Sequence, residues 1–307
     1  MLSLLAGLYP PLPGDDATRL RAVVADQHAA GLGVIADGRI HDPRTERPAE
    51  VAAALHALVA ARDAEADADA VPGSEPAEDP PLPAIALLGP LSSGAEPDVV
   101  RAAIAAAVGA GAAIVVLHEP FLLTPAAATE AERGRAVAAW CAALDGIDAH
   151  VTLAAPGGSI APVGVETLAA APFSSHYLDL IHAPDDWRVA ALLPPERGLV
   201  LGVADPRTER PESTAVLLWA ARYAASLGGR GLARVALAPA GGFAALPRDV
   251  ARGKLRLLAA AVRLAALPPE EAARRIDPRA VNARSAALGR VEPAPRRAPE
   301  TGEEPVT

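Results

Sequence analysis

Ionisable and phenolic side chains follow the ends of several short apolar runs in this sequence. The candidates are Tyr9, Asp37, His118, Glu119, His182 and Asp205. Carboxylates and imidazoles can accept or donate protons, orient a polar substrate or hold a metal ion. A gathering of such groups at the ends of apolar runs is typical of a ligand site, so we predict that these six side chains bind a small-molecule substrate.

A structural role competes with this interpretation for two of the carboxylates. Asp37 and Asp205 stand between an apolar run and a helical stretch, and an aspartate in that position commonly caps the helix. Capping explains Glu119 less well, because Pro120 follows it and no helix start is evident before Thr124. Both interpretations remain open for the two aspartates.

One heptapeptide, "DPRTERP", occurs twice, at Asp42–Pro48 and at Asp205–Pro211. Both copies lie between an apolar run and a helical stretch, and they contribute the arginines Arg44, Arg47, Arg207 and Arg210. Guanidinium groups bind carboxylates and phosphates in a bidentate manner, so these residues could attract an anionic substrate. The alternative is that biased composition placed charged loops at the surface.

The elements that must position these residues are eight short apolar runs, each followed by a helical stretch rich in alanine. The runs are Leu2–Tyr9, Val34–Asp37, Ile85–Gly89, Ile114–Glu119, Val151–Ala155, Tyr177–His182, Leu199–Asp205 and Val235–Pro239. Eight strand–helix units close a (β/α)8 TIM barrel, in which the active site lies at the C-terminal ends of the strands. A doubly wound sheet is the alternative, but no Gly-x-Gly-x-x-Gly fingerprint follows the first run.

Cap residues predict several of the intervening helices. They are Asp15–Ala30, Pro97–Ala110, Pro211–Leu227 and Pro247–Leu267, followed by one further short helix within residues 267–276. We predict a single barrel domain over residues 1–288. Within it, residues 63–83 form a flexible acidic insertion, and residues 289–307 follow as a disordered tail.

Composition narrows the class of partner. The 307 residues are 51% hydrophobic and only 3% aromatic, and the net charge is −9, which argues against nucleic acid and anionic membranes. No run reaches the roughly 18 apolar residues that span a bilayer. The apolar N-terminus lacks a basic region and is interpreted as the first strand. Cys141 is the single cysteine, which excludes an intrachain disulfide, and we expect a cytoplasmic protein.

Several motifs occur in the order found in a known family. They are "GLYP", "AAGLGVIADGR", "LLGPLSSG", "VVLHEP", "LVLGVADPRTERPES", "VALAPAGGF" and "ARGKLRLLAAAV". Over residues 1–265 the chain resembles the catalytic barrel of cobalamin-independent methionine synthase, in a short form without the N-terminal duplicate. The wider superfamily, which includes uroporphyrinogen decarboxylase, shares the fold. The resemblance implies a TIM barrel and a methyl transfer from 5-methyltetrahydrofolate to the thiol of homocysteine.

The resemblance also implies a zinc ion that activates the thiol, and here the sequence departs from the family. The positions of the family's His-x-Cys pair and of its later cysteine are Ala154, Pro156 and Gly241, while the family's glutamate falls near Ile181 or His182. Without soft ligands a zinc–sulfur site cannot form at these positions, so no cofactor is expected there. In contrast, Tyr9, Asp37, Glu119, Asp205 and Glu212 match the family's motifs.

Three functions remain open on this basis. The first is a divergent methyltransferase that works without the family's zinc site on a small-molecule substrate, for which an anionic folate is a candidate. The second is a relocated metal site built from the side chains His118, Glu119, His182 and Asp205. The third is a pseudoenzyme, a barrel that binds a ligand and performs no chemistry.

Overall fold

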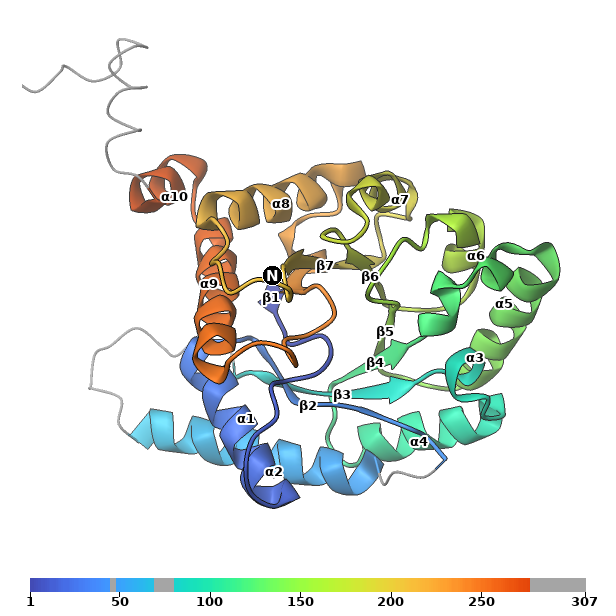
Figure 1. Cartoon of the computed structure of the whole chain (residues 1–307), viewed down its shortest axis with the longest axis horizontal. Coiled ribbons are helices and arrows are strands. Elements are labelled where there is room, and N and C mark those ends of the chain that lie inside the picture. The colour runs from blue at the N-terminus through green and yellow to red at the C-terminus, as the bar shows by residue number, and fades with distance from the viewer. Residues whose placement is uncertain (45–47, 69–79, 277–307) are drawn as a thin grey trace, which may run out of the picture. The chain divides into compact units, whose positions relative to one another are not determined.

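The computed structural model describes residues 1–44, 48–68 and 80–276. Met1–Ala266 form one compact unit, and a second unit begins at Leu267. The first unit contains eight parallel strands in a nearly closed barrel with helices outside it (Figure 1). The strands are β1 Leu2–Ser3, β2 Val34–His41, β3 Leu82–Leu88, β4 Ile114–His118, β5 His150–Ala154, β6 Ser175–Asp179, β7 Gly198–Ala204 and β8 Val235–Pro239. The predicted TIM barrel is therefore confirmed.

The sheet has two edges, although consecutive strands lie side by side. Its order is β1-β8-β7-β6-β5-β4-β3-β2, so that β1 pairs with β8 and β2 pairs with β3. At the gap between β1 and β2, the Tyr9 amide donates a 3.0 Å hydrogen bond to the Gly38 carbonyl. Gly38 has a φ of 76°, and the β2–β3 register shifts between Ala36 and Ile40. This bulge turns the end of β2 toward the turn that follows β1.

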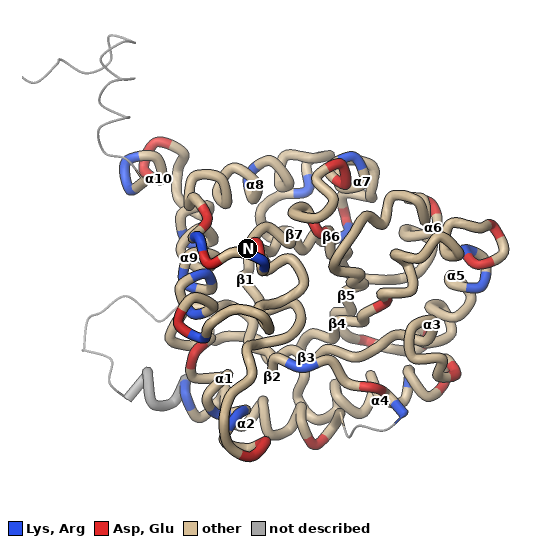
Figure 2. The backbone as a smooth tube through the Cα atoms, viewed as in Figure 1, with Lys and Arg blue, Asp and Glu red and all other residues tan. Residues whose placement is uncertain are grey.

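The helices follow the strands in the order that a barrel requires. They are α1 Asp16–Ala30, α2 Pro48–Ala68, α3 Pro90–Ser93, α4 Pro97–Gly109, α5 Glu130–Leu144, α6 Val165–Ala170, α7 Trp187–Leu192, α8 Thr214–Ser226 and α9 Arg248–Ala266, with α10 Pro269–Ile276 in the second unit. The caps of α1 are those expected, because Asp15 accepts a hydrogen bond from the Thr18 amide and Gly31 adopts a left-handed conformation. Acidic and basic residues interleave along the outer helices (Figure 2).

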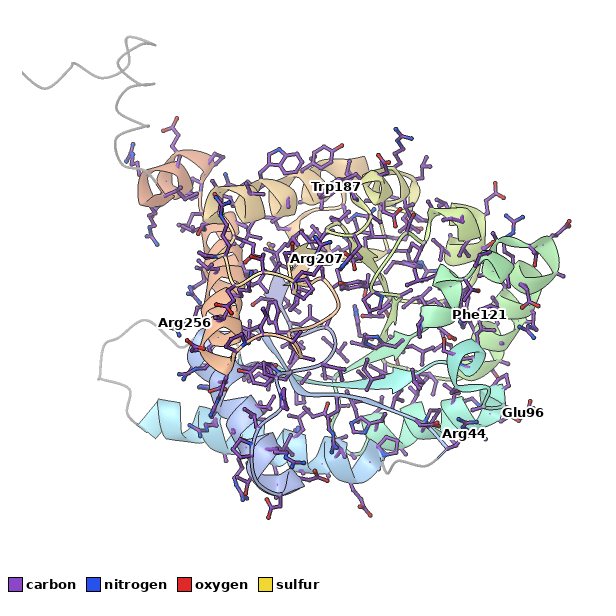
Figure 3. The ribbon with its side chains drawn as sticks, viewed as in Figure 1. Arg44, Glu96, Phe121, Trp187, Arg207 and Arg256 are labelled. Carbon is purple, nitrogen blue, oxygen red and sulfur yellow. The ribbon has the colours of Figure 1, made fainter. Side chains whose placement is uncertain are left out.

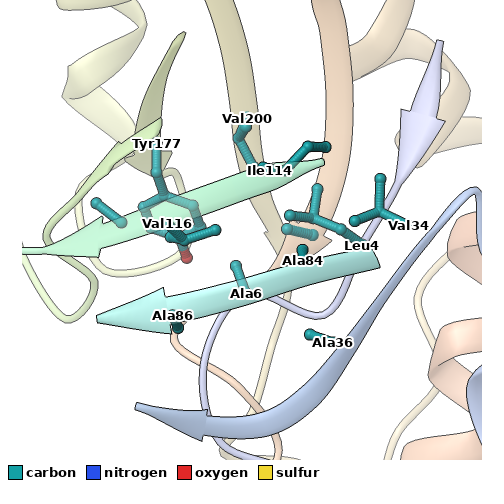
Figure 4. Close-up of a cluster of buried hydrophobic side chains, with 12 residues drawn as sticks. Leu4, Ala6, Val34, Ala36, Ala84, Ala86, Ile114, Val116, Tyr177 and Val200 are labelled. Atoms are coloured by element: carbon teal, nitrogen blue, oxygen red, sulfur yellow. The ribbon is translucent and has the colours of Figure 1, made fainter. Parts of the chain in front are cut away.

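Small side chains dominate the interior of the barrel. Alternate residues of the strands point inward and form one cluster, which includes Leu4, Val34, Ile114, Tyr177 and Val200 (Figure 4). Six of the twelve residues in this cluster are alanines. An eight-stranded barrel has an interior just wide enough for side chains to fill. The larger side chains of the cluster, such as Tyr177 and Ile114, therefore supply most of its packed volume.

The observed boundaries differ from the predicted ones mainly in the strands. The β1 ladder covers only Leu2–Ser3, β2 continues to His41, and β6 begins and ends earlier than the run Tyr177–His182. In the region of the predicted insertion, α2 continues to Ala68 and β3 begins at Leu82, while residues 69–79 and the tail 289–307 lie outside the described residues. None of the helices described is long and apolar enough to cross a membrane.

Candidate functional site

The C-terminal end of β6 carries an aspartate–histidine pair. Asp179 is the last residue of this strand and is 1% exposed. One carboxylate oxygen accepts hydrogen bonds from the amides of Ile181 and His182, and the other accepts a bond from His182 Nδ1 at 2.8 Å. A carboxylate only accepts, so Nδ1 carries the proton and Nε2 of the neutral ring keeps its lone pair. With 24% of its side chain exposed, His182 can receive a proton from a bound molecule.

His182 was predicted as a site residue from the sequence, whereas Asp179 was not. The predicted strand ran from Tyr177 to His182, which placed Asp179 in its middle rather than at its end. The available signal was the residue type, because a carboxylate inside the apolar run "YLDLI" must be paired or hydrogen-bonded when it is buried. That reasoning would have singled out Asp179 without the structure.

Two aspartates hold the loop after β5 in place: one is the last residue of β6 and the other follows that strand. Asp179 accepts a 2.7 Å hydrogen bond from the Gly157 amide, and Asp186 accepts bonds from the Ile160 amide and the Ser159 hydroxyl. These contacts hold the loop against the Asp179–His182 pair. The β5 loop is therefore part of the same site.

The positions that match the family's zinc ligands converge in space but offer no ligand. A Cβ atom on Gly241 would lie 3.4 Å from Cβ of Pro156, so the loops after β5 and β8 meet there. Ala154, the third position, is buried. In the described part of the chain, no group of three or more His, Cys, Asp and Glu side chains could hold a metal ion. The relocated metal site gains no support, since Glu119, His182 and Asp205 each face a different partner.

The two copies of the repeated heptapeptide share one contact between their first and third residues. Asp205 accepts hydrogen bonds from Nε and Nη2 of Arg207 at 2.9 and 3.0 Å, and Asp42 accepts the same pair from Arg44 at 3.1 and 2.7 Å. The arginine side-chain hydrogen bond is the main cause that lowers the pKa of each aspartate to about 2. Each copy thus begins with a local Asp–x–Arg fork, which uses two of the five N–H groups of its guanidinium.

The arginines of the repeat differ in their distance from the candidate site. Arg207 lies close enough to Asp179 for the carboxylate to contribute to its raised pKa, behind the larger effect of its Asp205 hydrogen bonds. Figure 3 shows Arg207 near the middle of the ring of helices and Arg44 near its edge. Arg210 is exposed, with its amide bonded to Thr208, while Arg47 lies outside the described residues. Of these arginines, among those described, only Arg207 has a pKa to which the Asp179 carboxylate contributes.

His118, the last residue of β4, is enclosed by the protein. Its side chain is 2% exposed, and its Nε2 atom has no hydrogen-bond partner among the residues described. Burial lowers the pKa of the ring to about 4, so the imidazole is neutral at neutral pH. The structure therefore places this predicted site residue inside the protein, away from solvent.

Glu119 is hydrogen-bonded to the backbone of a neighbouring helix and to a buried indole. Its carboxylate accepts hydrogen bonds from the amides of Leu91 and Ser92 at the start of α3 and from Nε1 of Trp140. Burial raises its pKa, and these hydrogen bonds oppose that shift. Glu119 thus binds the first turn of a helix that precedes its own strand in the sequence. Because this helix lies before Glu119 in the sequence, the residues that follow Glu119 give no signal of the contact.

Tyr9 and Asp37 lie on the side of the barrel formed by β1 and β2. The Tyr9 hydroxyl donates a 2.9 Å hydrogen bond to Asp26 of α1, while Asp37 lies 2.7 Å from Nε2 of His41. Both Tyr9 and Asp37 line a groove of about 990 Å³ that also involves Arg39. The six predicted site residues are therefore divided among several local clusters, and His182 with Asp179 is the pair whose imidazole reaches solvent.

Comparisons with known proteins support the fold without naming a family. The sequence matches no protein-family model and no curated protein. Among solved structures, a B12-independent methionine synthase from Shewanella sp. W3-18-1 has a TM-score of 0.65 at 15% identity, covering 85% of this chain and 96% of that one. A methyltransferase from Methanosarcina mazei has a TM-score of 0.57 at 12% identity, covering 85% and 93%.

A third similar structure belongs to another class of enzyme. Dihydrodipicolinate synthase from Acinetobacter baumannii has a TM-score of 0.52 at 14% identity, covering 96% of this chain and 84% of that one. At these identities the similarity shows a TIM-barrel enzyme fold alone. Lys254, the single lysine of the sequence, bonds Glu212 and the Arg210 carbonyl and is 1% exposed.

Proposed function

We propose that this protein is a methionine synthase-like methyltransferase that moves a methyl group from an anionic donor to a thiol without a zinc ion. The observation that carries the proposal is the Asp179–His182 pair at the C-terminal end of β6. The similarity to a B12-independent methionine synthase and to a methyltransferase supports the same class. A carboxylate-oriented imidazole can take the proton that zinc coordination would otherwise displace.

The proposed reaction balances without a metal. Nε2 of His182 removes the thiol proton, and the resulting thiolate sulfur forms a bond to the methyl carbon of the donor. The bond between that carbon and the donor nitrogen breaks, and its electron pair stays on the nitrogen. The imidazolium then returns the proton to this nitrogen, so His182 acts first as a base and then as an acid. Asp179 holds the ring in one tautomer throughout both steps.

The anionic part of the donor would be bound by Arg207. Its Nε and one Nη2 proton are used by Asp205, and the other N–H groups of the guanidinium remain to donate to an anion. The fork with Asp205 fixes the orientation of the guanidinium plane, and a fixed plane loses less entropy on binding a carboxylate. A folate carrying glutamate carboxylates is the candidate donor.

The test is turnover with 5-methyltetrahydrofolate triglutamate and homocysteine, followed by mass spectrometry of methionine, with and without a chelator. We expect chelator-resistant turnover that falls about 100-fold or more in His182→Gln. The matched control is His56→Gln, an exposed histidine on α2, which should retain full activity. Activity that disappears with the chelator, or that survives His182→Gln, contradicts the proposal. Binding of the folate without turnover would favour the pseudoenzyme instead.

A further inference from the structure

A second cavity opens at the N-terminal end of the barrel, opposite the candidate site. It measures about 500 Å³, and the first residue of every strand from Leu2 of β1 to Val235 of β8 lines it. This volume lies within the range of small-molecule sites, about 300 to 1,000 Å³.

One wall of this cavity is aliphatic. Leu4, Val34, Ile114 and Val200 belong to the interior cluster of the barrel and also line the cavity. Ala236 of β8 adds a partly exposed small side chain. Transfer of an apolar ligand group from water onto this wall is favourable.

Between Ile114 and Val200, the cavity is lined by a chain of hydrogen-bonding side chains from β5 and β6. Thr152 pairs with Ser175 across the two strands, and their hydroxyl oxygens are 2.7 Å apart. Nε2 of His150 lies 2.9 Å from the same Ser175 oxygen. Thr152 and Ser175 are each 2% exposed, so these hydroxyls line the closed part of the cavity. A ligand oxygen could join this chain.

The rim of the cavity is charged. Arg197 and Arg234 line it together with Glu196, from the loops that lead into β7 and β8. Nη1 of Arg197 donates a hydrogen bond to the Phe173 carbonyl, and Nη1 of Arg234 donates one to the Arg230 carbonyl. A guanidinium has five N–H groups, so both side chains retain donors for an anion.

We propose that the N-terminal cavity binds a small carboxylate with an aliphatic body. The body would lie against the aliphatic wall, and the carboxylate would be bound by Arg234 and Arg197 at the rim. This site is separate from the proposed methyl-transfer site and does not depend on it.

The test is calorimetric titration of the full chain with octanoate, a carboxylate of this type, and with 1-octanol as its uncharged match. We expect one octanoate site per chain, weakened about tenfold or more by Arg234→Gln, with little effect of that variant on octanol. Ala236→Phe should abolish binding of both, because its ring would fill the cavity. Circular dichroism and thermal unfolding would verify that both variants fold.

The control is His182→Gln, which changes the other end of the barrel and should leave octanoate binding unchanged. Octanoate that binds Ala236→Phe as tightly as the original protein would overturn the cavity assignment. Equal binding of octanoate by Arg234→Gln and the original protein would overturn the carboxylate assignment. Absence of any octanoate binding at millimolar concentration would overturn both.

Discussion

Two histidines of this protein are buried as neutral rings. His118 at the end of β4 and His176 in β6 are 2% and 0% exposed, and burial is the main cause that lowers the pKa of each to about 4. In the unfolded chain a histidine has a pKa near 6.5. Between pH 4 and pH 6.5 the unfolded chain therefore binds more protons than the folded protein. Lowering the pH through this range must destabilise the fold.

We predict that stability is complete above pH 6.5 and falls as the pH decreases toward 4. At pH 4.5 each of the two rings should contribute a loss on the order of 2 to 3 kcal/mol. His118→Leu should lose less stability than the original protein between pH 7 and 4.5 in urea unfolding. The exposed His56 of α2 supplies the control His56→Leu. An acid-dependent loss that is identical in both variants and in the original protein would contradict this account.

At the residue scale, individual site residues were easier to predict from the sequence than their hydrogen-bond partners. His182 was predicted from its position, but its partner Asp179 depends on where β6 ends, and a continuous apolar run does not mark that end. Tyr9 and Glu119 were predicted as substrate ligands, yet they bind Asp26 and the start of α3. Such partners lie far away in sequence or on a different element, and only the packed fold brings them together.

One buried carboxylate joins three elements of the barrel. Asp26 of α1 accepts hydrogen bonds from the Tyr9 hydroxyl after β1 and from Arg248 of α9. Arg252, one turn further along α9, lies 3.3 Å from the same carboxylate. Desolvation and the Asp26 hydrogen bond raise the pKa of Tyr9, which keeps its hydroxyl protonated as the donor. The contact joins α1, which packs on the edge strand β2, to α9, which packs on the edge strand β1.

We predict that Asp26→Ala lowers the free energy of unfolding by about 2 to 4 kcal/mol, because it leaves the buried Tyr9 hydroxyl without its acceptor and removes the arginine contacts. Tyr9→Phe should lose only about 1 kcal/mol, since both the ring and the ion pairs remain. The control Asp16→Ala, at an exposed aspartate of the same helix, should change stability by less than about 0.5 kcal/mol. Equal losses in Asp26→Ala and Asp16→Ala would refute the role of this contact.

The contact between the residues that follow β3 and β4 requires a glycine at position 89. A Cβ atom on Gly89 would overlap the Glu119 carboxylate, although the backbone angles of Gly89 suit any residue. We predict that Gly89→Ala lowers stability by about 1 to 3 kcal/mol in denaturant unfolding. Gly134 in α5 has open space around it, so Gly134→Ala should instead raise stability by about 0.5 to 1 kcal/mol. Two effects of the same sign would show that space at Gly89 is not the cause.

At the element scale, helices were predicted more closely than strands. The caps of α1 and the starting proline of α4 are local signals, and both helices begin within one residue of their predicted starts. The extent of a strand depends instead on its neighbours in the sheet. That dependence explains why β1 forms a ladder of only two residues while β2 continues through a bulge to His41.

The barrel as a whole has a gap in its hydrogen bonding between β1 and β2. We predict that β2 exchanges its amide hydrogens faster than β4, which has ladder partners on both sides. Hydrogen exchange with mass spectrometry should show earlier deuteration in peptides covering 34–41 than in peptides covering 114–118. Equal protection of the two strands would mean that the gap closes in solution.

The position of β1 also has a consequence for biosynthesis. Leu2 pairs with Ala236, so the ladder of β1 joins residues 234 positions apart. At a translation rate of about 5 to 20 residues per second, β8 is made roughly 12 to 47 seconds after β1. During that interval the nascent chain holds β1 without its ladder partner and with its apolar side chains uncovered. A chaperone that binds short apolar segments near the ribosome therefore has its longest opportunity at residues 2–9.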